Sequence, residues 1–406
     1  MKPEENLLYY FRRYIAISSQ SDAAANCLPS TPGQLELAKQ LQADLNEMGY
    51  SQTQLLDSGI LIAKLPGNKA GAKTLGFVAH LDTVDVGLSP DIKPQLLRYE
   101  GEPLCLNSEQ GIMVSEQECP ELAKYLGQEI LFSDGTSVLG ADNKAAIAVM
   151  MSLAKELSDS KIEHGDIYLG FVPDEEIGLR GAKVMPLERF PVDHCYTIDC
   201  CERGEVIFET FNAGSARLDV KGITAHPMSA KNVLVNPNLV VADFIAMVQD
   251  MGRPELTEGR EGYFWVTDIS GNQNQAQVSV AIRDFDADSY EARKTYLQNL
   301  LTFLRQKHPK AEIELTLTDV YSNIARAMSE NTSALDNLYQ ALKDLEIPAK
   351  TIPMRGGTDG SALSAMGLFT PNFFTGAHNF HSKYEFLPIP SFVDSYKVAK
   401  RLLELA

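Results

Sequence analysis

Three absences in the sequence narrow what this protein can be. Its six cysteines form no CxxC pair and no disulfide framework, which predicts a reducing compartment and a cytoplasmic protein. No apolar run is long enough to span a bilayer, and the N-terminal residues show no signal-peptide pattern, so no membrane partner is expected. Basic residues are outnumbered by acidic ones, 36 against 54, and the net charge of −18 argues against a nucleic-acid partner.

What the sequence contains is typical of a globular protein, with 44% apolar and 22% charged residues. At 406 residues the chain is too long for one core, so two domains are expected. Near residue 212 the pattern becomes strand, helix, strand, strand, helix, strand, the split β-α-β order of a small two-layer domain. An α/β pattern then resumes with a helix capped at Asn331. The predicted domains are a main α/β domain in two parts, 1–211 and 322–406, and an inserted domain at 212–321.

Helices are also predicted near both ends of the main domain, at 4–17 and 391–405. Another begins after Thr31, with Thr31 as its N-cap and Gln34 completing a capping box. Residues 86–133 show no helical period and are interpreted as an insertion of loops and hairpins.

Acidic side chains and an imidazole follow several predicted buried strands. The strand at 75–79 runs into His80 and Asp82, which the H-x-D spacing places on one side of extended backbone. The strand at 167–172 is followed by Glu175 and Glu176. As neighbours in extended backbone these two would point to opposite sides and so have different roles. Ligands of α/β sheets bind beyond the carboxyl ends of strands, so this pattern indicates a site.

Two more acids fit the same pattern. Asp199 ends the apolar stretch 195–198, and Asp142 opens a helix whose buried stripe includes Met150. A carboxylate at a helix start is also an ordinary cap, and an isolated Glu-Glu pair is usually a solvated turn. What favours a functional interpretation is that three strand ends and one helix start carry such side chains together.

Two features outside this group have open interpretations. The segment Arg355–Gly360 could bind an anion through its backbone amides or be only a tight loop. His381 follows a predicted strand, as the acids do, yet a single late histidine is more often structural or merely exposed.

Several carboxylates cannot share one cleft without cations, because like charges at close range repel. Imidazole with carboxylate suits zinc or a similar divalent ion. One aspartate bridging two metals, with one histidine and one further acid on each, leaves a single positive charge that a bridging hydroxide would cancel. The remaining glutamate would then be the base that takes a proton from the attacking water.

The motifs that carry these residues resemble the peptidase T family, dizinc aminotripeptidases of a clan that also contains glutamate carboxypeptidase, aminoacylase and succinyl-diaminopimelate desuccinylase. The resemblance runs nearly end to end. The matching motifs lie at residues 80–83, 140–145, 173–178, 197–199, 225–227, 282–285 and 355–360.

The resemblance implies a fold and a set of roles. The fold is a zinc-peptidase catalytic domain with a mixed central sheet flanked by helices, plus an inserted ferredoxin-like α+β domain that serves as lid and dimerisation domain. Asp142 would bridge two zinc ions, and the implied partners are a tripeptide substrate and a second copy of the chain. The other metal ligands would be His80 and Asp199 on one ion, and Glu176 and His381 on the other.

The resemblance also implies roles around the metals. Glu175 would be general base and then acid, while Asp82 would orient His80. His226 would reach the partner subunit's site to stabilise the oxyanion, and Arg283 and Arg355 would anchor the substrate. A cis peptide bond is implied between Asp142 and Asn143.

The chain departs from the family pattern at Cys200-Cys201, at His378 and Phe380, and by one residue near Leu179. These departures leave the implied metal ligands in place and bear on substrate preference. A dipeptidase or N-acyl-amino-acid amidohydrolase of the same clan is the nearest alternative function. A non-catalytic peptide-binding relative is the second, and retention of Glu175 and every ligand argues against it.

Overall fold

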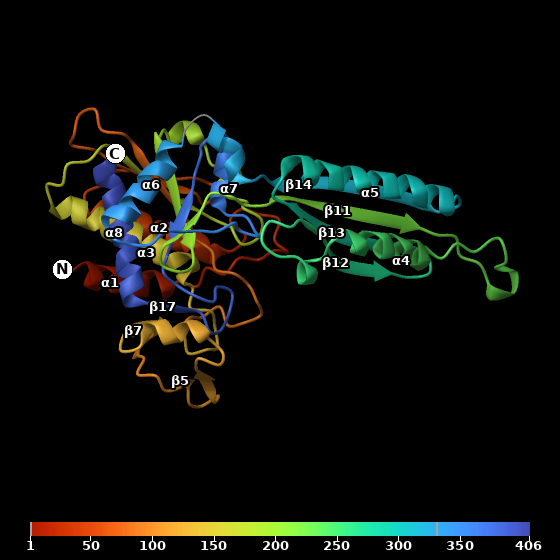
Figure 1. Ribbon diagram of the computed structural model, residues 1–406, viewed down its shortest axis with the longest axis horizontal. Helices are drawn as coiled ribbons and strands as arrows, with labels where there is room; N and C mark the ends of the chain where they lie inside the picture. The colour runs from red at the N-terminus through yellow and green to blue at the C-terminus, as the bar shows by residue number, and fades with distance from the viewer. Residues whose placement is uncertain (1, 330–331) are drawn as a thin grey trace. The chain divides into compact units, whose positions relative to one another are not determined.

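The structure is a computed structural model that describes residues 2–329 and 332–406 (Figure 1). It contains two compact units. The first comprises the chain up to Phe208 together with Arg326–Ile352 and Thr358–Ala406. The second comprises Glu209–Ala325 and the short return segment Pro353–Gly357, which the sequence did not indicate. No helix in the described part of the chain is both long and apolar enough to cross a membrane.

An eight-stranded mixed sheet forms the centre of the first unit, in the order β1-β2-β8-β3-β9-β16-β10-β15. The central neighbours β8, β3, β9 and β16 are parallel. Their residues are almost all buried, as expected for parallel strands covered on both faces. The bounds are β1 Gln52–Leu55, β2 Leu61–Leu65, β3 Leu75–His80, β8 Ile167–Val172, β9 His194–Cys200, β10 Glu205–Ile207, β15 Lys350–Thr351 and β16 Asn372–Phe374.

The helices of the first unit are α1 Pro3–Ile15, α2 Pro32–Glu47, α3 Ala141–Asp159, α6 Ser333–Asp344, α7 Asp359–Ala365 and α8 Ile389–Leu405. Helix α3 packs against α1 and α8 and also against β3 and β9. It is therefore buried on nearly every side, and not along one stripe as its sequence predicts. Helix α7 was not predicted. The Asn331 cap lies outside the described residues, and α6 begins at Ser333.

The predicted capping box of α2 is wrong. Helix α2 begins at Pro32 after Thr31, but the Thr31 side chain makes no capping hydrogen bond. The Gln34 amide instead bonds to the backbone and side chain of Asp174, 140 residues later in the chain. The Gln34 Nε2 also donates to the Thr31 hydroxyl at 3.2 Å, so Gln34 keeps a local contact without forming the capping box, while its acceptor oxygen binds a buried residue from another segment.

The insertion at 86–133 forms small sheets with a core of their own. Strands β4 Gln95–Arg98 and β7 Glu129–Phe132 pair with each other, and β7 also pairs with β17 Phe386–Pro388 near the end of the chain. Strands β5 Leu104–Asn107 and β6 Ile112–Val114 form a separate pair. The C-terminal segment that follows His381 therefore pairs with this insertion through β17.

The second unit is a four-stranded antiparallel sheet in the order β12-β13-β11-β14, with two helices packed on it (Figure 1). The chain order β11, α4, β12, β13, α5, β14 is that of a ferredoxin-like domain. Residues from both helices and all four strands fill its core. The bounds are β11 Asn212–Lys221, α4 Pro237–Val248, β12 Tyr263–Gly271, β13 Gln275–Asp284, α5 Ala287–Lys307 and β14 Glu312–Tyr321.

Candidate metal centre and active site

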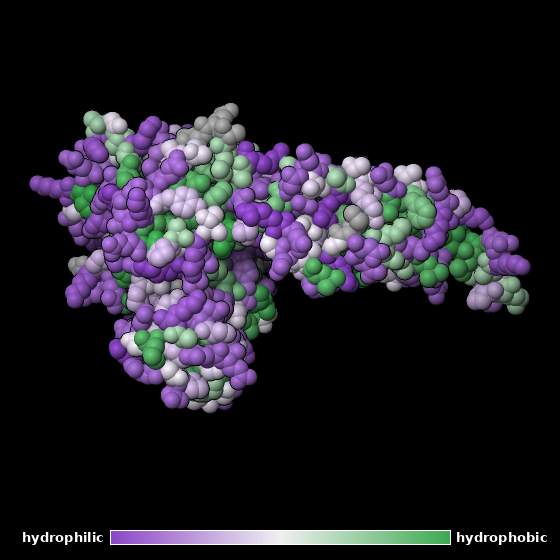
Figure 2. Space-filling model, in the orientation of Figure 1, coloured by the Kyte–Doolittle hydropathy of each residue, from purple (hydrophilic) through white to green (hydrophobic). Residues whose placement is uncertain are grey.

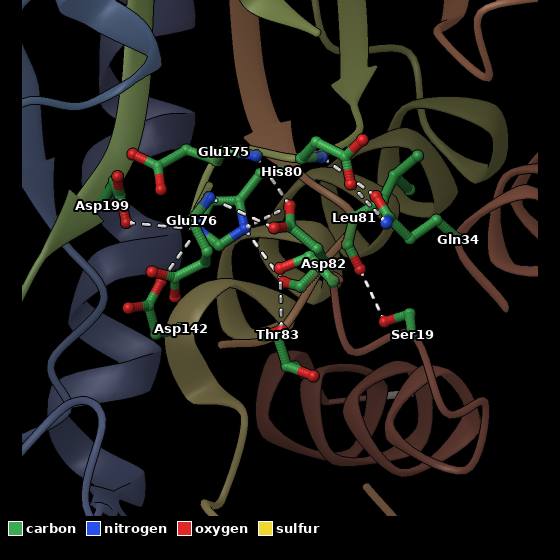
Figure 3. Close-up of polar contacts among 12 residues, drawn as sticks. Ser19, Gln34, His80, Leu81, Asp82, Thr83, Asp142, Glu175, Glu176 and Asp199 are labelled. Atoms are coloured by element: carbon green, nitrogen blue, oxygen red, sulfur yellow. Dashed lines mark hydrogen bonds and ion pairs between the residues drawn. The ribbon is translucent and has the colours of Figure 1, made fainter. Parts of the chain in front are cut away.

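The parallel strands deliver the predicted site residues to one edge of the sheet. His80 is the last residue of β3, and Asp199 is the second-last residue of β9. The turn with Glu175 and Glu176 follows β8, which pairs with β3. His381 follows β16, which pairs with β9. The carboxyl ends of parallel neighbours meet at one edge, so residues far apart in the sequence converge (Figure 3).

Asp142 stands between the two histidines. His80 Nε2 lies 2.9 Å from one carboxylate oxygen, Oδ1, and His381 Nε2 lies 3.2 Å from the other, Oδ2. The peptide bond from Asp142 to Asn143 is cis, as the resemblance implies. Because the two oxygens of Asp142 face different imidazoles, this carboxylate can contribute to two sites at once.

Each imidazole also faces a second carboxylate. His80 Nε2 is 3.8 Å from Asp199 Oδ1, and His381 Nε2 is 3.0 Å from Glu176 Oε1. One ring nitrogen carries at most one proton and cannot satisfy two carboxylates. The donor atoms of His80, Asp142 and Asp199 lie within 4.8 Å of one another, and so do those of Asp142, Glu176 and His381. One histidine with two carboxylates is a donor set that suits a divalent ion such as zinc.

The orientation of His80 is compatible with metal binding. Its Nδ1 lies 3.0 Å from the backbone carbonyl oxygen of Asp82, which can only accept a hydrogen bond. A neutral His80 therefore carries its proton on Nδ1 and directs the Nε2 lone pair toward Asp142 and Asp199. Such second-layer contacts fix the tautomer of metal-bound histidines in general.

The electrostatics of the cluster indicate a deficit of positive charge. Burial, followed by the charge of Asp142, raises the pKa of Glu176 to about 7. Burial, followed by repulsion from Asp142, raises the pKa of Asp199 well above its usual range. Burial opposes ionisation of Asp142 too, but hydrogen bonds from His381 and His80 lower its pKa overall. Two divalent cations would supply the missing charge.

Glu175 lies beside both groups. A donor oxygen of Glu175 is within 4.8 Å of donor atoms of His80 and Glu176. Burial raises its pKa well above that of a free glutamate, and the negative charges of Asp199 and Glu176 add to this effect. A buried carboxyl group with a raised pKa next to a metal centre can take up and return a proton.

Asp82 connects His80 to the Glu175–Glu176 turn in a way that the sequence did not indicate. Its carboxylate Oδ1 is 3.4 Å from His80 Nδ1, farther than its own backbone carbonyl. The two carboxylate oxygens instead accept the backbone N–H groups of Glu175, at 3.0 Å, and Glu176, at 3.1 Å. Asp82 thus orients His80 through its carbonyl and holds the turn through its side chain.

The predicted opposite directions of Glu175 and Glu176 are wrong. The two residues lie in a turn and not in extended backbone, so the two-residue alternation of a strand does not apply. Both side chains enter the cluster, where each has a donor oxygen within 4.8 Å of His80. Their environments differ, because Glu176 contacts His381 and Glu175 does not.

Two buried acids near the cluster were not predicted as site residues. Glu385 accepts the backbone N–H groups of Gly140 and Asp142. Asp359, at the start of α7, has its pKa raised to about 7 by burial, and its Oδ1 has no hydrogen-bond partner among the described residues. Asp359 lies inside the Arg355–Gly360 motif, whereas nothing in the local sequence marks Glu385.

The other three predicted site residues lie in the second unit, and their roles stay predictions. His226 is exposed, and its Nδ1 accepts the backbone N–H of Met228 at 3.2 Å. Arg283 donates to the carbonyl oxygens of Gly214 and Ile282. Arg355 is bound within its own unit by three acceptors, the carbonyl oxygens of Gly259 and Glu261 and the hydroxyl of Thr257.

Comparison with known proteins gives a consistent result. Residues 140–405 match the model of peptidase family M20/M25/M40. A peptidase T-like protein of Yersinia pestis is 54% identical over 398 residues, covering 98% of this chain and 97% of the relative. A peptidase T of Caldanaerobacter subterraneus subsp. tengcongensis is 38% identical over 398 residues, with 97% of each covered.

Solved structures share the fold. The aminopeptidase PepT from Bacillus cereus superposes with a TM-score of 0.76 at 20% identity, over 99% of this chain and 98% of that one. A protein from Bacillus subtilis described as a dinuclear metal-binding peptidase from the M20 family superposes with a TM-score of 0.66 at 13% identity, over 99% and 98%. The predicted fold class, a mixed central sheet flanked by helices with an additional α+β domain, is confirmed.

Proposed function

The chain belongs to peptidase family M20/M25/M40, and on this premise we propose that it is a metal-dependent aminopeptidase that releases the N-terminal residue of tripeptides. The observation that carries the proposal is the shared position of Asp142 between two histidine–carboxylate groups. This arrangement suits two divalent ions. The relatives named peptidase T and a similar solved structure described as a tripeptidase from Staphylococcus aureus support the substrate class.

The metals proposed are two zinc ions per subunit. His80 and Asp199 would hold one ion, Glu176 and His381 the other, and Asp142 would contribute one oxygen to each. A pair of divalent ions supplies Lewis-acid polarisation of the scissile carbonyl and lowers the pKa of a water molecule. The similar protein from Bacillus subtilis is described as dinuclear, which supports the number of ions.

Glu175 is the proposed general base and acid. It stands next to both groups without belonging to the two that share Asp142, so its carboxylate remains for proton transfer. Because burial raises its pKa, Glu175 can take the proton of the attacking water and then give it to the departing amine. Asp82 fixes the backbone from which this carboxylate projects.

His226 is proposed to stabilise the oxyanion in the site of a partner subunit. Since its Nδ1 accepts a hydrogen bond from the Met228 backbone, a neutral ring carries its proton on Nε2. That N–H is then directed away from its own backbone contact and is available as a donor. An exposed histidine in this tautomer suits a donor to a developing negative charge.

The homodimer is proposed to form through the second unit. Strands β12 and β14 are the edges of its sheet and have one unpaired side each. Figure 2 shows apolar side chains on the surface of this unit. Clustered exposed apolar residues and open sheet edges are typical of protein–protein contact sites. The exposed large apolar residues of the unit include Met228, Leu234, Leu239, Trp265, Ile269 and Phe303.

Arg283 is the proposed reader of the tripeptide C-terminus, with Arg355 as the alternate. No carboxylate among the described residues pairs with Arg283, whose guanidinium contacts backbone carbonyls and the Tyr321 ring. Arg355 is engaged by three acceptors and by the rings of Phe211 and Tyr263. Arg283 has fewer hydrogen-bond acceptors than Arg355, which favours it as the partner of a substrate carboxylate. A cytoplasmic location is proposed for the enzyme, since its cysteines suit a reducing compartment.

One assay tests the proposal against its nearest alternative. Purified protein is incubated with free dipeptides, free tripeptides, free tetrapeptides and N-acetylated tripeptides, with and without a chelator. Release of the N-terminal residue from free tripeptides, lost on chelation and restored by zinc, is the expected result. Turnover of N-acetylated substrates in preference to free ones would establish an amidohydrolase. No turnover of any substrate by zinc-loaded protein would favour a peptide-binding relative.

A further inference from the structure

Three successive backbone N–H groups in the turn after β8 are bound by side chains from other segments. The N–H of Asp174 donates to the side-chain oxygen of Gln34 at 3.0 Å. The next two, from Glu175 and Glu176, donate to the two carboxylate oxygens of Asp82 at 3.0 and 3.1 Å. The direction of the backbone is thus fixed at three consecutive residues, immediately at the proposed general base.

Gln34 binds Asp174 through both ends of its amide. Its Oε1 accepts the Asp174 backbone N–H, and its Nε2 donates to Asp174 Oδ1 at 2.6 Å. Ser30 adds two bonds to the same carboxylate, from its backbone N–H at 2.8 Å and from its hydroxyl at 2.5 Å. Every donor and acceptor of the Gln34–Asp174 contact is used, and the whole network is buried.

Asp174 needs this support. Its φ is +59°, a left-handed conformation that residues other than glycine rarely adopt. Such a conformation costs free energy and persists only where surrounding contacts determine it. Gln34 projects from the first turn of α2, a helix held in place by buried residues including Leu37 and Leu41. A rigid helix therefore holds a strained turn in a single arrangement.

We propose that Gln34 is a positioning residue for catalysis: by holding Asp174, it directs the Glu175 carboxylate toward the metal centre. This inference rests on the proposed function, in which Glu175 transfers the proton. Gln34 itself is not proposed to touch substrate or metal. The competing possibility is that Gln34 only satisfies buried polar groups, in which case its loss would lower stability without affecting proton transfer in particular.

The test replaces Gln34 by leucine, which is of similar size and removes both hydrogen bonds to Asp174 together with the longer contacts of the amide to Ser30 and Thr31. The expected result is a kcat lowered about 10- to 100-fold, because small misplacements of a catalytic group have effects of this size. KM and the zinc content per subunit are expected to stay within about twofold of the wild type. Amide hydrogen exchange of the metal-free protein gives a readout independent of activity: residues 171–181 are expected to exchange faster in the variant.

A reciprocal exchange of groups provides a rescue. Gln34→Glu alone places a second carboxylate against Asp174, and Asp174→Asn alone places two amide donors against each other. In the double variant Gln34→Glu with Asp174→Asn, the carboxylate at 34 accepts the backbone N–H and the new amide N–H. The asparagine oxygen still accepts from the Ser30 backbone. We expect each single variant to lose kcat and the double variant to regain most of it.

The matched control is Gln40→Leu. Gln40 is on the same helix and donates to Asp44 at 2.8 Å, away from the turn. Its loss is expected to leave kcat and the exchange of residues 171–181 unchanged. The proposal is overturned if Gln34→Leu leaves that exchange unchanged, if exchange rises while kcat does not fall, or if the double variant shows no recovery. Absence of peptidase turnover in the wild type contradicts the proposed function instead, and the exchange measurement then decides the positioning of the turn.

Discussion

The carboxylate of Glu385 accepts the backbone N–H of Asp142 at 3.1 Å, and its second oxygen accepts the N–H of Gly140 at 2.8 Å. Glu385 lies four residues after His381, so one short segment supplies a proposed metal ligand and a support for another. The side chain is buried, and burial together with the charge of Asp142 raises its pKa to about 8. This contact joins the segment of Asp142 to the segment of His381.

The first prediction concerns this support. Glu385→Ala is expected to lower the affinity for metal about 10- to 100-fold, the usual cost of losing an outer contact to a ligand. Glu385→Gln keeps one acceptor oxygen, so its metal affinity is expected to lie between those of the wild type and Glu385→Ala. Chelator competition followed by metal analysis measures the effect. Glu156→Gln, which disturbs a carboxylate bonded to Lys400, is the control. Unchanged metal affinity in Glu385→Ala would show that the contact does not support the ligands.

The second prediction separates the adjacent glutamates. Glu175→Gln is expected to lower kcat by about 10²- to 10⁴-fold with both metals retained, because a base is lost and no ligand. Glu176→Gln is expected to lower metal occupancy as well, because Glu176, Asp142 and His381 together form one of the candidate metal-ligand sets. Metal content and kcat are measured on the same preparations. Loss of metal from the Glu175 variant alone would reverse the two assignments.

The third prediction concerns His378, a departure from the family pattern. Burial lowers its pKa to about 4, while an unfolded histidine titrates near 6.5. The buried ring is therefore neutral, and its contribution to stability is fully present above pH 6.5. As the pH falls from 6.5 to 4, His378 binds a proton in the unfolded state but not in the folded state. The free energy of unfolding therefore falls by up to roughly 3 kcal/mol.

His378→Gln isolates this effect, because glutamine does not titrate and can still hydrogen-bond the Tyr125 hydroxyl, which lies 2.6 Å from His378 Nε2. Urea unfolding of both proteins is measured between pH 4 and 8. The stability difference between wild type and variant is expected to shrink as the pH falls through this window, because only the wild type loses this contribution. Parallel stability curves would show that His378 does not titrate in this way.

The sequence predicted the convergence of the site because that convergence follows from strand ends. His80 and Asp199 end parallel strands, and the rule that such ends share an edge needs no three-dimensional information. The inserted domain could also be predicted from the sequence, because the hydrophobic periodicity of each segment indicates whether it is a strand or a helix.

Long-range contacts were not predictable in this way. Gln34 fits a local capping motif, yet its partner Asp174 lies 140 residues later in the sequence. Nothing in the local sequence marks Glu385, and only the folded chain shows that it binds the Asp142 backbone. Asp359 lies within the motif at 355–360, but the motif alone does not show that its side chain is buried near the cluster. The directions of Glu175 and Glu176 were mispredicted because a turn was treated as a strand. Each error concerns a partner or direction that tertiary structure decides.

The fourth prediction concerns the dimer. His226→Ala is expected to lower kcat by about 10²- to 10³-fold with metals intact, the usual effect of losing an oxyanion donor. Mixing His226→Ala with Glu175→Gln subunits tests donation between subunits. A hybrid then has one site with both defects and one with neither, so activity is expected to return partly. Hybrids verified by mass that remain inactive would place His226 in its own subunit's site or outside catalysis.

The fifth prediction concerns tripeptide length. Three extended residues span roughly 10 Å, so a cation at that reach from the metals selects tripeptides by binding their C-terminal carboxylate. A charge-assisted contact to a carboxylate is worth about 1.5–3 kcal/mol. Arg283→Ala is therefore expected to lower kcat/KM for free tripeptides about ten- to a hundredfold. Tripeptide amides, which lack the charge, are expected to lose much less.

The controls make this prediction specific to Arg283. Arg217→Ala removes an arginine of the same sheet whose guanidinium is already paired with Asp219, and it is expected to leave both substrate types unaffected. Arg355→Ala tests the alternate cation by the same ratio of acid to amide. If the loss of kcat/KM for free tripeptides relative to amides is larger in Arg355→Ala than in Arg283→Ala, Arg355 is the residue that binds the C-terminal carboxylate. If acids and amides lose equally in both variants, neither arginine reads the C-terminus. The length rule would then have to come from another part of the enzyme, and the insertion at 86–133 is the next segment to test.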